Sequence, residues 1–145
     1  MTLYRADWNW FGLVVVAWVV LLGLVYTPAS FWFDVRYVRV EDSVAGIHPV
    51  MEVDRSIHRD FRADWTATVM RKGAGGFSTF CVARGGSDYR PDASLPDDLD
   101  LDWWTWSTKC VLPPGIYRVK TLWVLHLPIF PDKEVRSTSN VFEVR

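Results

Sequence analysis

The sequence predicts an all-β fold, an antiparallel β-sandwich, preceded by one N-terminal transmembrane α-helix. Three observations lead to this prediction. An uncharged apolar stretch lies near the N-terminus, and beyond residue 30 apolar and polar side chains alternate in short segments. Glycines and prolines separate these segments, and none of them shows the period of an amphipathic helix. Alternation with a period of two is typical of sheets that bury one face and expose the other.

Residues 10–26 form the apolar stretch and contain no charge. A helix rises about 1.5 Å per residue, and about 20 apolar residues therefore cross a hydrocarbon core roughly 30 Å thick. The uncharged run extends over residues 8–33 when Asn9 and the junction at residues 27–30 are included. We therefore expect residues 10–26 to lie in a lipid bilayer, with aromatic side chains in both headgroup layers, namely Trp8, Trp10, Tyr26, Phe31, Trp32 and Phe33.

Two other interpretations of this stretch are open. A cleaved signal peptide would have Thr27 and Ala29 as the small residues before the cut. Against cleavage, the run exceeds the usual h-region of about 7–15 residues, and Asp7 offsets the charge of Arg5. The other interpretation is a buried helix of a soluble protein, but nothing later in the chain looks able to cover a helix that is apolar all round. A permanent signal anchor is the interpretation that we favour.

The chain divides into two parts at this stretch. Residues 1–30 are assigned to the N-terminal tail and the anchor helix, and residues 31–145 to one compact β-sandwich domain. The formal net charge is −1, which lacks the basic excess of a nucleic-acid-binding protein, so no nucleic-acid partner is expected. Aromatic residues make up 15% of the chain and include nine tryptophans, which predicts a Trp-rich core besides the aromatic belts.

Cys81 and Cys110 are the two cysteines of the chain, and both fall in alternating, strand-like runs. In an oxidising compartment we expect them to form a disulfide, worth about 3–4 kcal/mol in the chain-entropy model. The alternative is two buried free thiols in a cytosolic domain. A zinc site is not predicted, because the sequence has no CxxC motif and no histidine at ligand spacing from either cysteine.

The expected topology is a single pass through a membrane, with a cytoplasmic N-terminus and the C-terminal domain on the outer side. A first span that follows a short tail normally exports what comes after it. The positive-inside rule slightly favours the opposite orientation, because Arg5 precedes the span and Arg36 and Arg39 follow it. We discount these two arginines as part of the first strand, and the expected disulfide favours the outer side.

Strands are predicted from Val-rich and aromatic runs between turn signals. The first covers residues 32–41, where a change of phase at Tyr37 and Val38 indicates a bulge. A turn at Gly46 leads to the second, residues 50–55. The clearest strand covers residues 61–70, and one of its faces presents Phe61, Ala63, Trp65, Ala67 and Val69.

The second half of the domain continues this pattern. Residues 71–76 supply the glycines of a hairpin, and residues 77–84 return as the partner strand. Residues 85–102 are expected to form one long polar insertion. Further strands are predicted at residues 103–112, 116–127 and 135–144, with a tight turn at 113–115 and a proline-flanked apolar loop at 128–132.

Two features predict an Ig-like or fibronectin-III-like sandwich. Trp65 on a central strand beside a Cys–Cys bridge is typical of an immunoglobulin core, and residues 112–121 (LPPGIYRVKT) resemble the turn and penultimate strand of such domains. In a true Ig domain the tryptophan lies between the cysteines, whereas Trp65 precedes both. The prediction therefore concerns shared architecture.

Three segments carry a resemblance to a family. Residues 54–65 (DRSIHRDFRADW), residues 101–119 with the LDWWTW and LPPGIYRV runs, and residues 139–144 (SNVFEV) resemble small uncharacterised membrane proteins of bacteriophages and prophages. Those proteins have a single N-terminal span and an Ig-like outer domain. The resemblance covers most of the chain and implies a phage or prophage origin and residence in the cell envelope. None of its motifs is catalytic, so it assigns no site.

Asp98, Asp100 and Asp102 are candidate ligands of a calcium ion. An EF-hand that began at Asp98 would need Gly at its sixth position and Glu at its twelfth, but Trp103 and Lys109 occupy them. A calcium site of less regular geometry on the rim of the sandwich is one interpretation. The alternative is that these aspartates keep a strand edge solvated and so discourage pairing with another strand.

Two apolar groups are candidates for binding. Trp103, Trp104 and Trp106 could form a platform for a sugar or a peptidoglycan strand, but alternation separates Trp103 from the other two and favours core and rim positions. Ile129 and Phe130 at the loop tip could contact another protein, and packing against the sandwich end or the bilayer is the alternative.

No catalytic arrangement is predicted. His48, His58 and His126 are scattered, and no acidic or nucleophilic partner recurs at a telling spacing. We therefore expect a protein without enzymatic activity or cofactor, which acts through protein–protein contacts at the cell envelope. The alternatives are a structural component of a virion and a sugar- or calcium-binding adhesion module.

Overall fold

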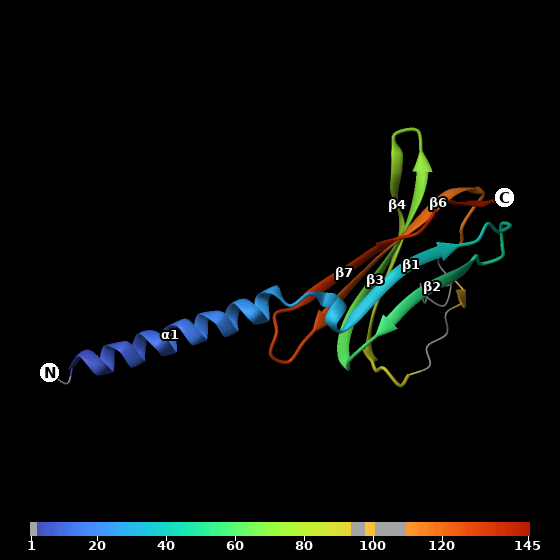
Figure 1. The fold of residues 1–145 in the computed structure, drawn as a ribbon. Helices are drawn as coiled ribbons and strands as arrows, with labels where there is room; N and C mark the ends of the chain where they lie inside the picture. Colours follow the sequence, from blue (N-terminus) through green and yellow to red (C-terminus); the bar gives the residue numbers. More distant parts are fainter. Residues whose placement is uncertain (1–2, 94–97, 101–109) are drawn as a thin grey trace.

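The computed structural model describes residues 3–93, 98–100 and 110–145 and shows one long helix joined to a β domain (Figure 1). The helix α1 (Leu3–Tyr26) passes through the short 3-10 turn η1 (Ala29–Phe31) into the first strand. The described strands are β1 (Phe33–Val40), β2 (Val50–Ile57), β3 (Phe61–Gly73), β4 (Gly76–Tyr89), β5 (Asp98–Asp100), β6 (Gly115–His126), β7 (Lys133–Thr138) and β8 (Phe142–Val144).

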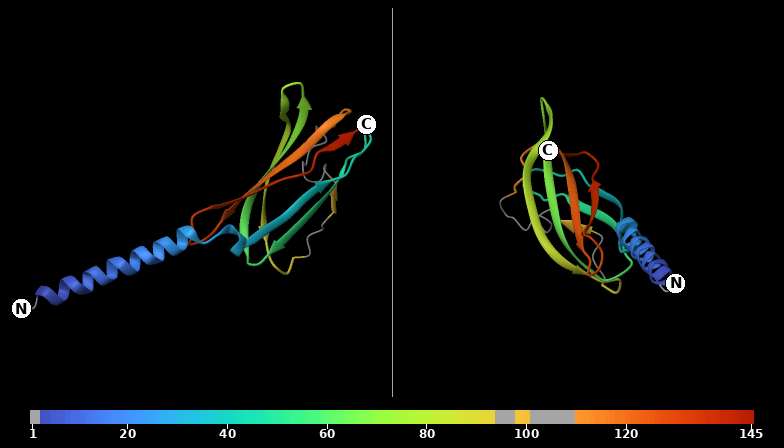
Figure 2. Two further views of the ribbon diagram at one scale, coloured as in Figure 1. Left: turned by 45° about the horizontal axis from the view of Figure 1, so that its top comes forward. Right: turned by 90° about the vertical axis from the view of Figure 1, so that its left-hand side faces the viewer.

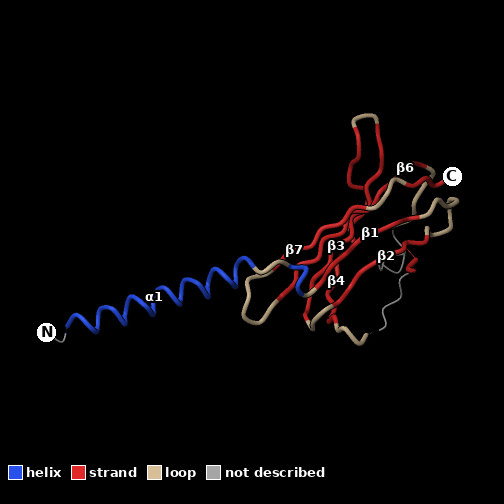
Figure 3. The backbone as a smooth tube through the Cα atoms, in the orientation of Figure 1, coloured by secondary structure: helices blue, strands red, loops and turns tan. Residues whose placement is uncertain are grey.

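The strands form two sheets, which lie in separate layers in Figure 2. One sheet has the order β1-β2-β5, and the other has the order β4-β3-β6-β7, with β8 also paired to β6. Every pairing between these strands is antiparallel. Figure 3 shows that, after the short blue turn η1, the described part of the domain is built from strands and loops, and that the long helix lies outside it. The predicted all-β, antiparallel fold with one N-terminal apolar helix is confirmed.

The core lies between the two sheets. Phe33 on β1 faces the other sheet, and the centroid of its ring lies 5.4 Å from that of Phe61, 5.7 Å from that of Tyr89 and 5.4 Å from that of Trp123. Met51 and Val53 on β2 are fully buried. Burial of these apolar side chains against one another is the main force that holds the two sheets together.

The predicted alternation is confirmed on the two central strands. On β3 the five side chains expected to point inward are all buried, namely Phe61, Ala63, Trp65, Ala67 and Val69. On β6 the inward side chains are buried as well, namely Tyr117, Val119, Thr121, Trp123 and Leu125. Trp65 and Trp123 are directly opposite each other in the pairing of β3 with β6, and they form the Trp-rich centre of the core.

The polar insertion predicted to begin at Gly85 is wrong, because β4 continues to Tyr89. Gly85 lies opposite Trp65 in the pairing with β3. A Cβ atom at Gly85 would stand 2.4 Å from Cζ2 of Trp65, so the glycine leaves the space that the indole ring fills. Some glycines stay within a strand because another group approaches them closely. The sequence alone does not distinguish such a glycine from one that ends the strand.

The strand predicted at residues 103–112 is wrong at its described end. Cys110, Val111 and Leu112 belong to no strand, and β6 begins only at Gly115. Pro113 and Pro114 have no amide hydrogen to donate to a neighbouring strand, which explains why pairing starts after them. Residues 103–109 lie outside the described part of the chain.

The predicted bulge in β1 is present one position before the expected site. The pairing of β1 with β2 shifts between Val35 and Tyr37, so Arg36 is the extra residue. The free edge of β1 faces the second sheet near Asn140, whose side chain donates to the carbonyl of Val40 over 2.9 Å and accepts from its amide over 2.8 Å. The asparagine side chain thereby satisfies backbone groups that a neighbouring strand would otherwise pair.

Candidate functional site

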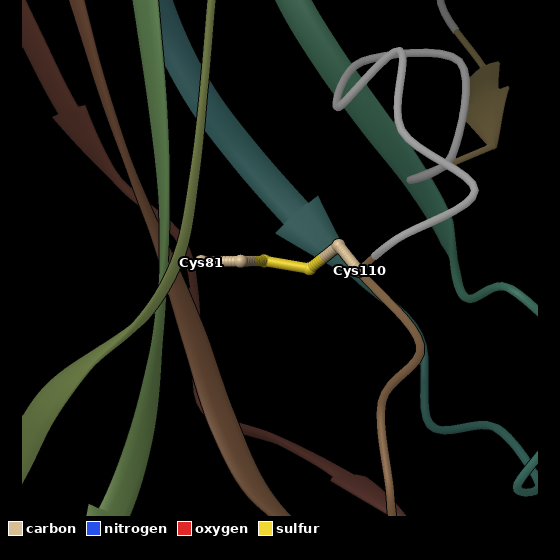
Figure 4. The surroundings of a disulfide bond; sticks show 2 residues. All are labelled: Cys81 and Cys110. Atoms are coloured by element: carbon tan, nitrogen blue, oxygen red, sulfur yellow. A yellow bond between two sulfur atoms is a disulfide. The ribbon is translucent and has the colours of Figure 1, made fainter.

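The Cys81–Cys110 disulfide links β4 to the segment that leads into β6 (Figure 4). The two Cα atoms are 6.2 Å apart. The residues that follow Cys110, Val111 and Leu112, line one depression together with the β1–β2 turn at residues 46–49. The disulfide therefore ties the edge of the larger sheet to a segment that lies beside the turn of the smaller one. The predicted pairing of the two cysteines is confirmed.

The end of α1 is joined to the β domain through Lys133, the first residue of β7. Its Nζ donates to the carbonyl oxygens of Leu24, over 3.5 Å, and of Val25, over 2.5 Å. Thr27 donates two hydrogen bonds to the carbonyl oxygen of Gly23, one from its amide over 3.1 Å and one from its hydroxyl over 2.6 Å. The last carbonyls of a helix have no partner within the helix, and a cation near them is also favoured by the helix dipole.

An aromatic cluster lies directly beside this junction. The ring centroid of Trp32 is 4.9 Å from that of Phe31 and 4.7 Å from that of Phe130, and both pairs meet edge to face. The guanidinium of Arg59 lies over the ring of Phe31, 4.1 Å from its centroid. We call Phe31, Trp32, Arg59, Phe130 and Lys133, together with Ile129, the helix-proximal surface.

The two residues predicted at the loop tip have different environments. Phe130 is partly buried and packs on Trp32, whereas Ile129 is 74% exposed. Phe130 therefore packs against the end of the domain, which is one of the alternatives that the sequence left open. Ile129 is left at the surface as an apolar side chain without a cover in the described structure.

His126, at the end of β6, lies between two carboxylates. Its Nε2 is 3.0 Å from Oδ2 of Asp64 on β3, and its Nδ1 is 3.1 Å from Oδ2 of Asp132 in the β6–β7 loop. The hydrogen bond with Asp64, followed by the charge of Asp132, raises the pKa of His126 above its usual value. The protonated imidazole can donate to both carboxylates at once and so attach the loop to the sheet.

Comparison of the chain with known protein families, with curated protein sequences and with solved structures found no match. The geometry of the described residues is therefore the basis for a functional proposal. Two parts of the surface enter it, the helix-proximal surface and the outer edge of β4. Strand β4 ends the order of its sheet, and its side chains Phe80 and Val82 are 37% and 47% exposed.

The structure brings none of the other predicted site residues into a described site. Asp98 and Asp100 are the ends of β5, paired with Glu52 and Val50 on β2. Asp102 and the three tryptophans Trp103, Trp104 and Trp106 lie outside the described residues. Within the ranges 3–93, 98–100 and 110–145, no group of three or more His, Cys, Asp or Glu residues could hold a metal ion.

Sequence reasoning missed three functional candidates, Lys133, Arg59 and His126. Lys133 and its partner Val25 are 108 positions apart, and His126 and Asp64 are 62 apart. No local pattern signals such a pair. The only signal in the sequence is the alternation on the strands, which places His126 and Asp64 on the outward face of neighbouring strands without showing that they meet.

Proposed function

We propose that this chain is a single-span protein of a bacterial inner membrane, with a cytoplasmic N-terminus and a periplasmic domain that binds another protein. One observation carries the proposal. The 19-residue apolar segment Trp8–Tyr26 is covered by no other part of the described structure, and a few residues later it continues into a disulfide-linked β domain. An uncovered apolar helix is stable in lipid, and disulfides persist in oxidising compartments.

The domain is further proposed to be Ig-like. Besides the two facing sheets, the hydroxyl of Tyr117 near the start of β6 donates to the carbonyl of Pro113 over 2.6 Å. A tyrosine at this place, bonded to backbone a few residues upstream, is a feature of Ig-type sandwiches. Burial raises the pKa of Tyr117 above its ordinary value, at which the hydroxyl is already protonated at neutral pH and able to donate. The phage or prophage origin belongs to the same proposal and rests on the sequence resemblance.

The outer edge of β4 is the surface that we propose for the protein partner. Within the described residues β4 pairs only with β3, so the opposite side of its backbone can accept a strand from another chain on either side of Cys81, where the disulfide brings in the segment at Cys110. The exposed side chains of Phe80 and Val82 add apolar area there. The domain would act by contact rather than by catalysis.

The compartment is tested by thiol labelling in intact cells. The full chain is expressed with a C-terminal tag, and its cysteines are probed with a membrane-impermeant maleimide before and after treatment with a reductant. We expect labelling only after reduction, and none for a Cys81→Ser, Cys110→Ser double variant. Two thiols that react without reduction only after the inner membrane is opened would overturn the periplasmic placement.

The partner is tested by photocrosslinking in membranes. A photoreactive amino acid replaces Val82 on β4 in one variant and Val44 in the β1–β2 turn, 58% exposed, in the control. A discrete crosslinked protein band is expected for position 82 and not for position 44. The absence of such a band at position 82 in infected cells, with the protein recovered instead in purified particles, would favour the virion component over the envelope binder.

A further inference from the structure

We propose that the β6–β7 loop, residues 127–132, rests in the phospholipid headgroup layer of the membrane that α1 crosses, so that the domain is seated on the bilayer. This inference rests on the proposed function, because it requires α1 to span. It adds an interaction surface, the helix-proximal surface, and a partner, the lipid interface.

The depth of the loop relative to the membrane follows from the hydrogen bonds of Lys133. A segment of 19 residues at about 1.5 Å per residue has roughly the length of a hydrocarbon core. Leu24 and Val25 therefore lie at the boundary between the core and the headgroup layer. Because Lys133 donates to their carbonyls, the start of β7 lies within one side-chain length of that boundary, and the β6–β7 loop joins β7 at this point. Figure 1 shows the loop turned toward the end of α1.

The side chains of the helix-proximal surface suit this layer. Amphipathic aromatic residues and long cations concentrate at membrane interfaces, where the apolar part meets acyl chains and the polar part meets water. Phe31 is 44% exposed and carries the guanidinium of Arg59 over its ring, while the buried Trp32 supports Phe130 from beneath. Ile129, 74% exposed, is the apolar side chain that the layer would cover.

The loop is held in place before it meets lipid. Lys133 attaches its end to α1, Phe130 attaches its middle to Trp32, and Asp132 attaches its flank to His126 over 3.1 Å. A loop fixed in its bound conformation loses little conformational entropy on contact. The three attachments come from three different elements, so the loop and the helix end move together.

Exposure by itself does not select this loop. Ile47 in the β1–β2 turn is 66% exposed, close to the value for Ile129. That turn follows β1, which leads away from α1, and it lies at the far end of the domain in Figure 1. The contact with α1 distinguishes Ile129 from Ile47, and Ile47 therefore serves as the matched control.

The test measures depth in the bilayer with the full chain in phosphatidylcholine vesicles. A fluorescent amino acid is placed in separate variants at Ile129, at Ile47 and at Val19 within α1. Lipids with bromine on shallow or on deep acyl carbons quench nearby fluorophores. We expect position 129 to be quenched by shallow bromines more than by deep ones, position 19 by deep ones, and position 47 by neither.

The outcomes separate the two proposals. Quenching at position 19 with none at 129 would overturn the seated loop and leave the span intact. Lack of quenching at position 19 would overturn the span and, with it, the loop inference. A measurement without a fluorophore checks the result, since Ile129→Asp should speed amide hydrogen exchange of residues 127–132 in vesicles, whereas Ile47→Asp should not. Equal exchange in the wild type and the Ile129→Asp variant would likewise contradict the seated loop.

Discussion

Lys133 Nζ lies 2.5 Å from the carbonyl oxygen of Val25, so the first residue of β7 completes the end of α1 across 108 positions of sequence. This contact exists only in the folded chain, and it helps to set the direction in which the helix leaves the domain. It also brings the β6–β7 loop to the level at which the apolar segment ends.

Replacing Lys133 with Met should loosen the junction between helix and domain. The loss of a cation at a helix C-terminus costs about 0.3–1 kcal/mol, and the carbonyls of Leu24 and Val25 lose a donor. Amide hydrogen exchange of residues 26–32 in micelles should therefore become faster. Lys120→Met, on the exposed outer face of β6, is the control and should leave these amides unchanged. Identical exchange in the two variants would show that Lys133 does not hold the junction.

Replacing Gly85 with Ala should destabilise the core. The new Cβ would stand 2.4 Å from Cζ2 of Trp65, and such overpacking costs about 1–3 kcal/mol. Denaturant unfolding of the full chain in micelles, followed by tryptophan fluorescence, measures the change. At Gly86 the nearest atom to a new Cβ is Oδ1 of Asp64, at 2.8 Å, which belongs to a side chain that is 61% exposed and can shift toward solvent. Gly86→Ala should thus cost less than Gly85→Ala, and the reverse order would be evidence against the placement of Trp65.

Replacing Tyr117 with Phe should lower the free energy of unfolding by about 0.5–1.5 kcal/mol, because the carbonyl of Pro113 loses its hydrogen bond inside the domain. Tyr37→Phe removes a hydroxyl that donates to Glu52 over 2.7 Å on the exposed surface, where water can replace it. The same unfolding measurement should show a smaller loss for Tyr37→Phe. Equal losses would mean that the Tyr117 hydroxyl is no better shielded than a surface hydroxyl.

Removing the disulfide with Cys81→Ala and Cys110→Ala should destabilise the domain by about 3–4 kcal/mol, since the bridge closes a loop of 29 positions in the unfolded chain. Unfolding curves of the oxidised wild type, the reduced wild type and the double variant provide the comparison. The reduced protein and the variant should unfold at similar denaturant concentrations, both below the oxidised protein. A reduced protein as stable as the oxidised one would contradict this prediction.

The attachment of the β6–β7 loop should depend on pH through His126. The pKa of His126 is raised in the folded state by Asp64 and Asp132, so protonation stabilises the folded form. This contribution is fully present below the unfolded pKa of about 6.5 and is lost as the pH rises through the higher folded value. NMR titration of the imidazole, with amide exchange of residues 127–132, measures both effects. In His126→Gln the exchange of the loop, after correction for intrinsic rates, should no longer change over this range.

Much of the fold could be predicted from patterns within short segments of the sequence. Alternation on residues 61–70 and 116–127 identified the buried faces of β3 and β6, because a strand with one wet face must alternate wherever it is placed. The uncharged apolar run at residues 10–26 predicted the C-terminal part of α1, which begins earlier, at Leu3. The pairing of Cys81 with Cys110 could be predicted because these are the two cysteines of the chain and one intramolecular pairing is available to them.

The tertiary structure decided what depends on distant neighbours. Gly85 continues β4 because Trp65 fills the space beside it, and the sequence around Gly85 contains no sign of that ring. Lys133 reaches Val25, and His126 reaches Asp64 and Asp132, only after the sheets have formed. Local periodicity reports whether a side chain faces inward or outward, whereas the identity of its partner depends on how the strands are ordered and connected. For that reason the sequence alone predicted the apolar helix and the buried faces of β3 and β6, whereas the contacts of the helix-proximal surface are decided only by the fold.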